Sequence, residues 1–194
     1  RSYPNSRTDL FAMFIEKGLA SCKPSGKNSM ITMDAWMFAP AYLEFREKIL
    51  RETAISSVAH FGPRAFDLIS GEVVSTVAFT LDTIAAPNGK PVFLRLVSGR
   101  TESEKSQMLV NQSSRFANHT QTSFFDMSGS PLAYWLSEGF LRRMKDWRPL
   151  KDLAEPRSGL TTGDNDRFLR LWFEVAEFNP RISDINYSQD VFDK

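Results

Sequence analysis

ISSVAHFGPRAFDLISGEVVSTVAFTL, residues 55–81, is the stretch of sequence that decides the fold. It predicts a strand over residues 55–60 and a second strand over residues 73–81, where apolar side chains alternate with small or polar ones. The loop between the two strands carries Phe61 and Phe66. An aromatic side chain on a loop at a sheet edge either covers the core or offers a surface on which a ligand stacks, and both interpretations remain open at this point.

The segments that precede this stretch alternate between helices and strands. Apolar residues at helical spacing predict a helix over residues 6–22, with Ser6 as its cap. Pro40 suits the first turn of a second helix that runs to about Arg51, and residues 29–33 form a short strand between the two helices. This order is typical of an α/β architecture, in which helices cross over between parallel strands.

A further strand over residues 92–97 follows a turn at residues 87–91, so that residues 73–97 predict a β-hairpin. Only about half of a doubly wound sheet is visible, and the missing strands would lie before Arg1. Half a sheet leaves a strand edge unpaired. We therefore expect the chain on its own to self-associate through that edge or to remain partly disordered.

The composition of the chain changes after residue 99. Residues 101–112 are polar and compatible with a helix, whereas residues 113–130 are rich in Ser, Thr, Asn and Gln and predict a linker or irregular segment. Residues 131–145 are again helix-like. A domain boundary is therefore expected near residue 100 or within the next 30 residues.

The overall charge is balanced, with 24 Lys and Arg against 23 Asp and Glu and a net charge of +1. This balance gives no support to a free-standing nucleic-acid-binding protein, which usually carries a basic excess, although a local basic patch remains compatible with it. The single Cys22 excludes an internal disulfide and argues against a structural zinc site. No apolar run approaches the roughly 20 residues that span a bilayer, so we expect a cytoplasmic protein. The first residue is not Met, which suggests a piece of a longer protein.

Short catalytic signatures are absent from the sequence: there is no GxGxxG, P-loop, HExxH or GxSxG motif. The chain has two histidines. His60 ends a predicted strand, where it is either a half-buried polar residue or a catalytic group. His119 lies in the polar segment, where we expect it to be solvated.

Two charged clusters each allow two interpretations. Asp164 and Asp166 either form a turn that their side chains stabilise or bind a cation through oxygen ligands. A basic run from Arg142 to Lys151 is interleaved with Trp147. Such a run either contacts phosphate groups or is simply an exposed charged helix end.

Three longer runs of sequence carry a resemblance to a known family. They are PNSRTDLFAMFIEKGLASCKPSGKNSMITMDAWMF, AHFGPRAFDLISGEVVSTVAF and GLTTGDNDRFLRLWFEV, which begin at residues 4, 59 and 159. In this order they closely resemble adenine-specific DNA methyltransferases of the PglX type, found in BREX phage-defence systems, and more broadly the gamma-class restriction-modification methyltransferases. The resemblance extends from about residue 4 to residue 175.

The resemblance implies a doubly wound, Rossmann-like sheet of seven strands that binds S-adenosylmethionine and transfers its methyl group to the exocyclic amine of adenine in DNA. In that family the catalytic tetrapeptide Asn-Pro-Pro-Tyr lies just upstream of the part that matches residues 4–22. Neither this tetrapeptide nor a glycine-containing cofactor loop occurs here. The resemblance thus implies that residues 1–100 are the C-terminal half of the catalytic domain, residues 101–194 are a linker and the beginning of the target-recognition region, and the chain alone is inactive.

The resemblance also assigns roles to individual residues. Phe66 falls where related enzymes place an aromatic ring that stacks on the target adenine once it has been rotated out of the duplex. Phe14 falls where the family places an aromatic ring against the adenine of the cofactor, with Asp9 opening the same helix; a core position explains Phe14 equally well. Arg167 and Arg170 are candidates for phosphate contact, and an ion pair with a neighbouring aspartate explains them at least as well.

The implied partners are double-stranded DNA and, in a phage-defence setting, other proteins of the system. The implied cofactor is S-adenosylmethionine, and no metal is required. Two other function classes remain: a non-catalytic DNA-recognition or protein-interaction module that retains half a methyltransferase fold, and a methyltransferase that acts on a small molecule.

Overall fold

The structure is a computed structural model, and a part of the chain is described in it. The described residues are 6, 9–67, 74–112, 114–148 and 150–155. The chain divides into two compact units, Arg1–Trp147 and Arg148–Lys194. The predictions for Arg167, Arg170 and the Asp164–Asp166 turn lie outside the described residues, and the assignment of residues 101–194 to a recognition region stays a prediction.

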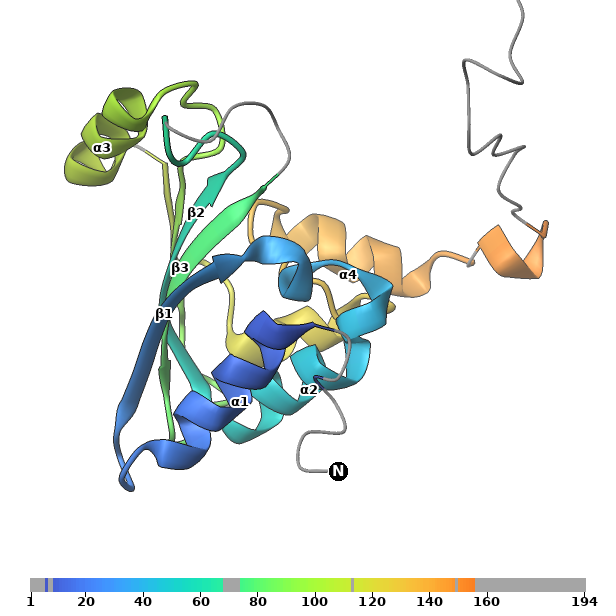
Figure 1. The fold of residues 1–194 in the computed structure, drawn as a ribbon. Coiled ribbons are helices and arrows are strands. Elements are labelled where there is room, and N and C mark those ends of the chain that lie inside the picture. The colour runs from blue at the N-terminus through green and yellow to red at the C-terminus, as the bar shows by residue number, and fades with distance from the viewer. Residues whose placement is uncertain (1–5, 7–8, 68–73, 113, 149, 156–194) are drawn as a thin grey trace, which may run out of the picture. The chain divides into compact units, whose positions relative to one another are not determined.

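In the described part of the chain, five strands form one mixed sheet, in the spatial order β1-β3-β2-β4-β5 (Figure 1). The strands are β1 (Lys27–Met33), β2 (Ala54–Gly62), β3 (Thr76–Asp82), β4 (Val92–Arg95) and β5 (Arg115–Phe116). β3 is antiparallel to both β1 and β2, β4 is parallel to β2, and β5 is antiparallel to β4. β1, β2 and β4 therefore run in one direction, and their carboxyl ends lie at the same edge of the sheet.

The α/β class and the strand predicted over residues 55–60 are confirmed, but one prediction about pairing is wrong. The sheet is mixed, because β3 is antiparallel to β1 and β2, which run parallel to each other. Residues 73–97 do not form a hairpin, because β2 lies between β3 and β4 and pairs with both. The placement of this sheet as half of a doubly wound sheet stays a prediction.

The helices confirm most of the helical segments predicted from the sequence. The helical segments are α1 (Leu10–Ser21), η1 (Asp34–Met37), η2 (Pro40–Tyr42), α2 (Leu43–Glu52), α3 (Glu102–Asn111), η3 (Gln121–Asp126), α4 (Glu138–Asp146) and η4 (Leu150–Asp152). The predicted Ser6 cap is wrong. Asp9 caps α1 by accepting a hydrogen bond from the backbone N–H of Leu10 at 3.1 Å, while Ser6 donates to the carboxylate of Glu16.

The hydrophobic core lies between the sheet and the helices α1 and α2, which cover one of its faces (Figure 1). Trp36 is the largest fully buried side chain among the described residues, and it meets the rings of Phe45 and Phe79 edge-on at centroid distances of 6.2 and 5.4 Å. Edge-to-face pairs of this kind contribute roughly 0.5–1.5 kcal/mol each beyond their area burial. Helix, connector and strand are thereby joined in one core.

A linker or irregular segment was predicted over residues 113–130, and residues 114–130 are largely irregular but contribute to this core. Phe124 is buried in it. The side-chain amide of Gln121 accepts a hydrogen bond from the N–H of Ile55 at 2.8 Å and donates to the carbonyls of Leu50 and Thr53 at 2.9 and 2.6 Å. The polar composition of this segment therefore reflects hydrogen bonds to backbone groups inside the protein.

Candidate functional site

The carboxyl ends of the three codirectional strands bring polar side chains to one edge of the sheet. Asp34 follows β1 directly, His60 lies near the end of β2, and Arg95 ends β4. Ser75 lies at the same edge, because it directly precedes β3, which runs in the opposite direction. Ligands of open α/β sheets bind outside the carboxyl ends of the strands. This edge is therefore the candidate site.

A buried hydrogen-bond network connects the elements at this edge. The ring atoms Nε2 and Nδ1 of His60 lie 2.9 Å from Asp34 Oδ2 and from the Tyr134 hydroxyl, respectively. Ser75 donates to the same oxygen of Asp34. Burial acts to raise the pKa of Asp34, but the hydrogen bonds from His60 and Ser75 outweigh it and hold that pKa below its usual value. Asp34 is then ionised at neutral pH, so Nε2–H of His60 donates to it; in the neutral imidazole, Nδ1 accepts from the Tyr134 hydroxyl.

The environment of His60 favours the structural interpretation of this residue over the catalytic one. His60 is 7% exposed, and both of its ring nitrogens are engaged inside the protein. Sequence reasoning missed its partners Asp34 and Tyr134. The position of Asp34 at a strand end could have marked it, but Tyr134 is 74 residues away along the chain and carries no local signal.

Beside this network lies a pocket of about 370 Å³ whose lining is largely aromatic. Phe116, Tyr134 and Trp135 contribute rings to it, and His119 lines it as well. His119 was expected to be solvated, and it is buried instead because its segment packs into the core. The guanidinium of Arg95 lies 5.7 Å from the ring centroid of Trp135, which gives this part of the edge a positive charge next to an exposed ring.

Phe66 lies at the same edge, in the loop that follows β2. Its side chain is 43% exposed, so it does not serve as a lid on the core. The loop leaves β2 through Gly62, which has φ = +70°. A Cβ on Gly62 would lie 3.1 Å from both methyl groups of Val97, so both the backbone conformation and the space favour glycine there.

The two residues predicted to bind the cofactor lie at the beginning and in the first half of α1. Phe14 is 55% exposed, so the alternative of a core position is wrong for the described part of the chain. The carboxylate of Asp9 accepts hydrogen bonds from the N–H of Leu10 and, at 3.4 Å, from the hydroxyl of Tyr42. A short connection joins the end of α1 to the start of β1, so the beginning of α1 lies toward the carboxyl end of β1. The cofactor roles of Phe14 and Asp9 stay predictions.

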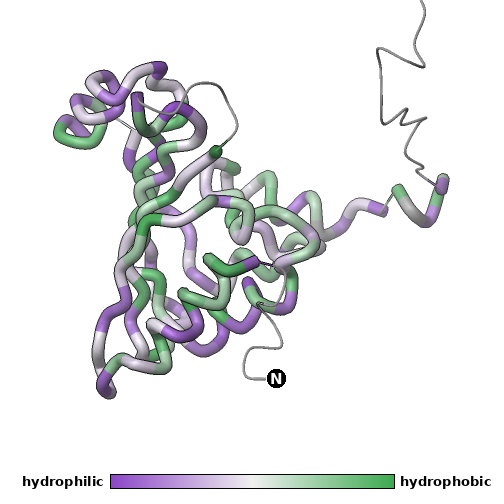
Figure 2. The backbone as a smooth tube through the Cα atoms, in the orientation of Figure 1, coloured by the Kyte–Doolittle hydropathy of each residue, from purple (hydrophilic) through white to green (hydrophobic). Residues whose placement is uncertain are grey.

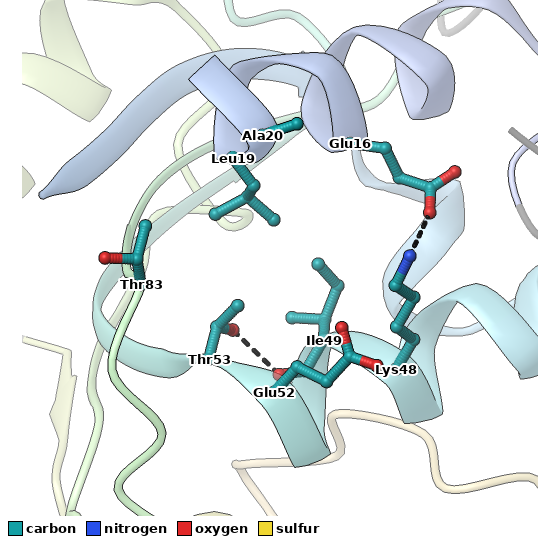
Figure 3. A pocket seen from close by; sticks show the side chains of 8 residues that line it. All are labelled: Glu16, Leu19, Ala20, Lys48, Ile49, Glu52, Thr53 and Thr83. Atoms are coloured by element: carbon teal, nitrogen blue, oxygen red, sulfur yellow. Dashed lines mark hydrogen bonds and ion pairs between the residues drawn. The ribbon is translucent and has the colours of Figure 1, made fainter. Parts of the chain in front are cut away.

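A second pocket, of about 270 Å³, lies between α1 and α2 (Figure 3). Glu16 and Lys48 meet at one side of it, with Lys48 Nζ 2.7 Å from Glu16 Oε1, and this hydrogen bond raises the pKa of Lys48. Leu19 and Ile49 contribute apolar surface. These two charges compensate each other, and Glu52 adds a further carboxylate to the lining.

The basic run predicted around α4 is at the surface. Arg142 and Arg143 are exposed, while Leu141 on the same helix is buried. Trp147 is 60% exposed, and its ring meets that of Phe140 edge-on at 6.2 Å. Exposed guanidinium groups beside exposed rings fit contact with a nucleic-acid backbone, and a solvated helix end remains the alternative.

The described part of the chain shows neither a metal site nor a membrane-spanning helix. Within it, no cluster of three or more His, Cys, Asp and Glu side chains has the arrangement of a metal site. None of the helices there has the length and hydrophobicity that a bilayer crossing requires.

The chain is similar to known adenine-specific methyltransferases. Residues 1–66 match the family described as Eco57I restriction-modification methylase. Over 177 residues the chain is 38% identical to "Adenine-specific methyltransferase BrxX" of Escherichia coli O9:H4 (strain HS), and over 183 residues it is 36% identical to "Adenine-specific methyltransferase PglX" of Lacticaseibacillus casei (strain Zhang). Each alignment covers 91% of this chain but only 14% and 15%, respectively, of those relatives.

Proposed function

From the homology of this chain to a segment of Eco57I- and PglX-type adenine-specific methyltransferases, we propose that it is part of a site-specific DNA methyltransferase. The enzyme transfers a methyl group to the exocyclic amine of adenine in DNA and serves in phage defence or restriction-modification. S-adenosylmethionine is the methyl donor. Double-stranded DNA is the substrate.

The exposed ring of Phe66 at the carboxyl edge of the sheet is the observation that carries this proposal. Adenine in a duplex is out of reach of an enzyme, so the base must be rotated out of the stack at a cost of a few kcal/mol. An exposed aromatic face recovers part of this cost by stacking on the base. Phe66 is 43% exposed and does not cover the core, which leaves its ring available for this role.

Positive charge on the surface supports a DNA substrate. Arg95 ends β4 beside Trp135, and Arg142 and Arg143 are exposed on α4. Phosphate contacts by arginine fix the position of DNA, whereas aromatic rings contact unstacked bases. We assign Arg142 and Arg143 to backbone contact. Arg167 and Arg170 remain candidates for the same role.

The arrangement of the sheet supports placing the catalytic half of the enzyme next to β1. β1 is an edge strand among the described residues and pairs only with β3 there. Its outer row of backbone donors and acceptors can pair with a further strand. The Asn-Pro-Pro-Tyr motif and the cofactor loop would come from this upstream half, and they would orient the adenine amine toward the methyl group.

The residues on α1 fit a supporting role in cofactor binding. The ring of Phe14 is exposed and therefore free to lie against the adenine of S-adenosylmethionine. Asp9 holds the beginning of α1 through its cap and its contact with Tyr42. These residues bind and orient, and no proton transfer is assigned to them.

Methylation mapping tests the proposal. Genomic DNA from a strain with the gene and from the same strain without it is sequenced by a method that detects N6-methyladenine. We expect methylation of adenine at one short recognition sequence only when the gene is present. Identical adenine methylation in the two strains would refute the proposal and would favour a non-catalytic module or a small-molecule methyltransferase.

A further inference from the structure

α3 is held to the rest of the protein in an unusual way. The helix is largely hydrophilic (Figure 2), and Val110 and Leu109 near its end are exposed rather than buried. Its buried side chain is that of Lys105, which is 1% exposed. Lysine is almost never fully buried unless its ammonium group is paired. The contact of α3 with the rest of the protein is thus made by the polar end of Lys105. The groups that bind this ammonium indicate the role of the helix.

The ammonium group of Lys105 holds the end of β2. Nζ donates to the carbonyl oxygen of Phe61 at 2.6 Å and to that of Leu96 at 3.0 Å. Burial lowers the pKa of Lys105. The stem passes close to Gly99, where a Cβ would lie 2.8 Å from Lys105 Cγ, so the space for this side chain depends on glycine. Phe61 is the residue before Gly62, through which the Phe66 loop leaves β2.

The beginning of α3 contacts the same loop directly after Phe66. The backbone N–H of Glu102, in the first turn of α3, donates to Asp67 Oδ1 at 3.0 Å. Thr101 caps the helix by accepting from the N–H of Glu104 at 3.2 Å. First-turn N–H groups have no partner within a helix and carry the positive end of its dipole, so a carboxylate there is stabilised. Asp67 directly follows Phe66 in the sequence.

The loop between these two contacts needs external support. Gly62 and Arg64 have φ values of +70° and +57°, and a left-handed conformation is costly for a residue such as arginine. Such conformations persist where the surrounding structure enforces them. α3 supplies a contact before and a contact after this strained stretch, and Figure 1 shows the helix beyond the end of β2.

We propose that α3 is a positioning element for Phe66, and that it acts through Lys105 at the end of β2 and through Asp67 next to the ring. The proposal rests on the function assigned above, in which Phe66 stacks on the adenine rotated out of DNA. Lys105 and Asp67 do not touch the substrate. They fix the backbone on which the ring is carried, and a displacement of about 1 Å in such a group can lower a reaction rate by about 10²-fold.

The test uses the complete protein as its gene encodes it and a DNA duplex that carries the mapped methylation site. The variants are Asp67→Ala, Asp67→Asn and Lys105→Met. Two readouts are measured: the methylation rate, and the rise in 2-aminopurine fluorescence when this analogue replaces the target adenine and leaves the stack. We expect Asp67→Ala and Lys105→Met to lower the methylation rate by about 10²-fold and to reduce the fluorescence rise. Asp67→Asn should keep the methylation rate and the fluorescence rise within about twofold of wild type. Its amide oxygen can also accept the hydrogen bond from the N–H of Glu102.

Two comparisons separate positioning from general destabilisation. Phe124→Leu changes the core away from the loop and should leave the fluorescence rise unchanged, even where it lowers the melting temperature as much as Asp67→Ala. If Phe66→Ala has no effect on either readout, the assigned role of Phe66 fails and the positioning proposal falls with it. If Phe66→Ala lowers both readouts but Asp67→Ala and Lys105→Met behave as wild type, the positioning proposal alone is overturned. Should Lys105→Met fail to fold, the proposal is tested by Asp67→Ala and Asp67→Asn alone, because Asp67 is exposed.

Discussion

Arg46 offers the sharpest test of how the core is assembled. Its side chain is 1% exposed, and its guanidinium donates to the carbonyls of Trp36 and Ala39 at 2.9 and 3.1 Å. It also donates to the carbonyls of Gly129 and, at 3.0 Å, of Ser130. Arg46 on α2 thus joins η1 to a segment more than 80 residues later. The change we consider is Arg46→Met.

The expected loss of stability follows from these hydrogen bonds. Methionine retains most of the apolar stem, but four carbonyl groups lose a donor, and a buried acceptor left without a partner costs about 1–3 kcal/mol. The net loss of stability is smaller than the sum of these four costs. Burial of the guanidinium itself costs several kcal/mol, and methionine avoids this cost. We expect the free energy that holds residues 129–134 against the core to fall by about 3 kcal/mol, which corresponds to roughly 10²-fold in an equilibrium constant.

Hydrogen exchange of the complete gene product measures this change. The N–H of Leu132 donates to the carbonyl of Met37 at 3.0 Å, next to the contacts of Arg46, and it should exchange about 10²-fold faster in Arg46→Met. The control is Arg51→Met on the same helix, whose side chain is exposed and pairs with Glu47, and which should change exchange by less than about threefold. Equal rates in the two variants would refute the reasoning.

Three further predictions concern charge, acidity and backbone conformation. Replacing Arg142 and Arg143 with Gln should lower the slope of log binding constant against log salt concentration by about 0.9 for each phosphate group that arginine no longer neutralises; an unchanged slope would exclude such a role. The lowered pKa of Asp34 means that its ionised form stabilises the fold above the ordinary carboxyl pKa of about 4, and that this stability is lost as the pH falls through the lower folded value. The melting temperatures of wild type and Asp34→Asn should therefore differ more at pH 7 than at pH 3, and a constant difference would contradict this. Gly62→Ala should destabilise the fold by about 1–3 kcal/mol in chemical denaturation because of its positive φ, whereas Gly139→Ala, with open space in α4, should be neutral or stabilising.

Local patterns in the sequence were enough to predict individual elements but not their partners. The alternation predicted over residues 73–81 is seen in β3, where Val77, Phe79 and Leu81 are buried. The helical spacing predicted α1, but Leu10 and Phe14 of its apolar set are exposed. Alternation does not say which strand lies next to which. The expected hairpin over residues 73–97 failed for this reason, since β3 and β4 pair on opposite edges of β2.

The polar segment over residues 113–130 shows a second limit. A run of Ser, Thr, Asn and Gln is typical of a linker, yet Gln121 satisfies three backbone groups and Phe124 fills the core. These partners are more than 65 residues away along the chain, so no local pattern predicts them. The same holds for the pairing of His60 with Tyr134, which sequence reasoning did not find.

The candidate site was predicted in part. The loop with Phe66 was identified from its position between two strands, and the structure places the ring at the surface, where stacking is physically possible. The sequence left open whether Phe14 belongs to the core, and its exposure resolves that point. The contacts of Lys105 and Asp67 could not be foreseen, because a buried lysine in a polar helix looks like any solvated one.

The methylation activity of Phe66→Ala tests the central claim most directly. The complete gene is restored to a strain that lacks it, either as wild type or as Phe66→Ala, and N6-methyladenine is mapped by sequencing. Loss of base stacking worth about 1–3 kcal/mol should lower the methylation rate by roughly 5- to 150-fold at the site that wild type methylates, with little change in melting temperature because the ring is partly exposed. Methylation by Phe66→Ala at the wild-type rate, or no adenine methylation by wild type, would contradict the account.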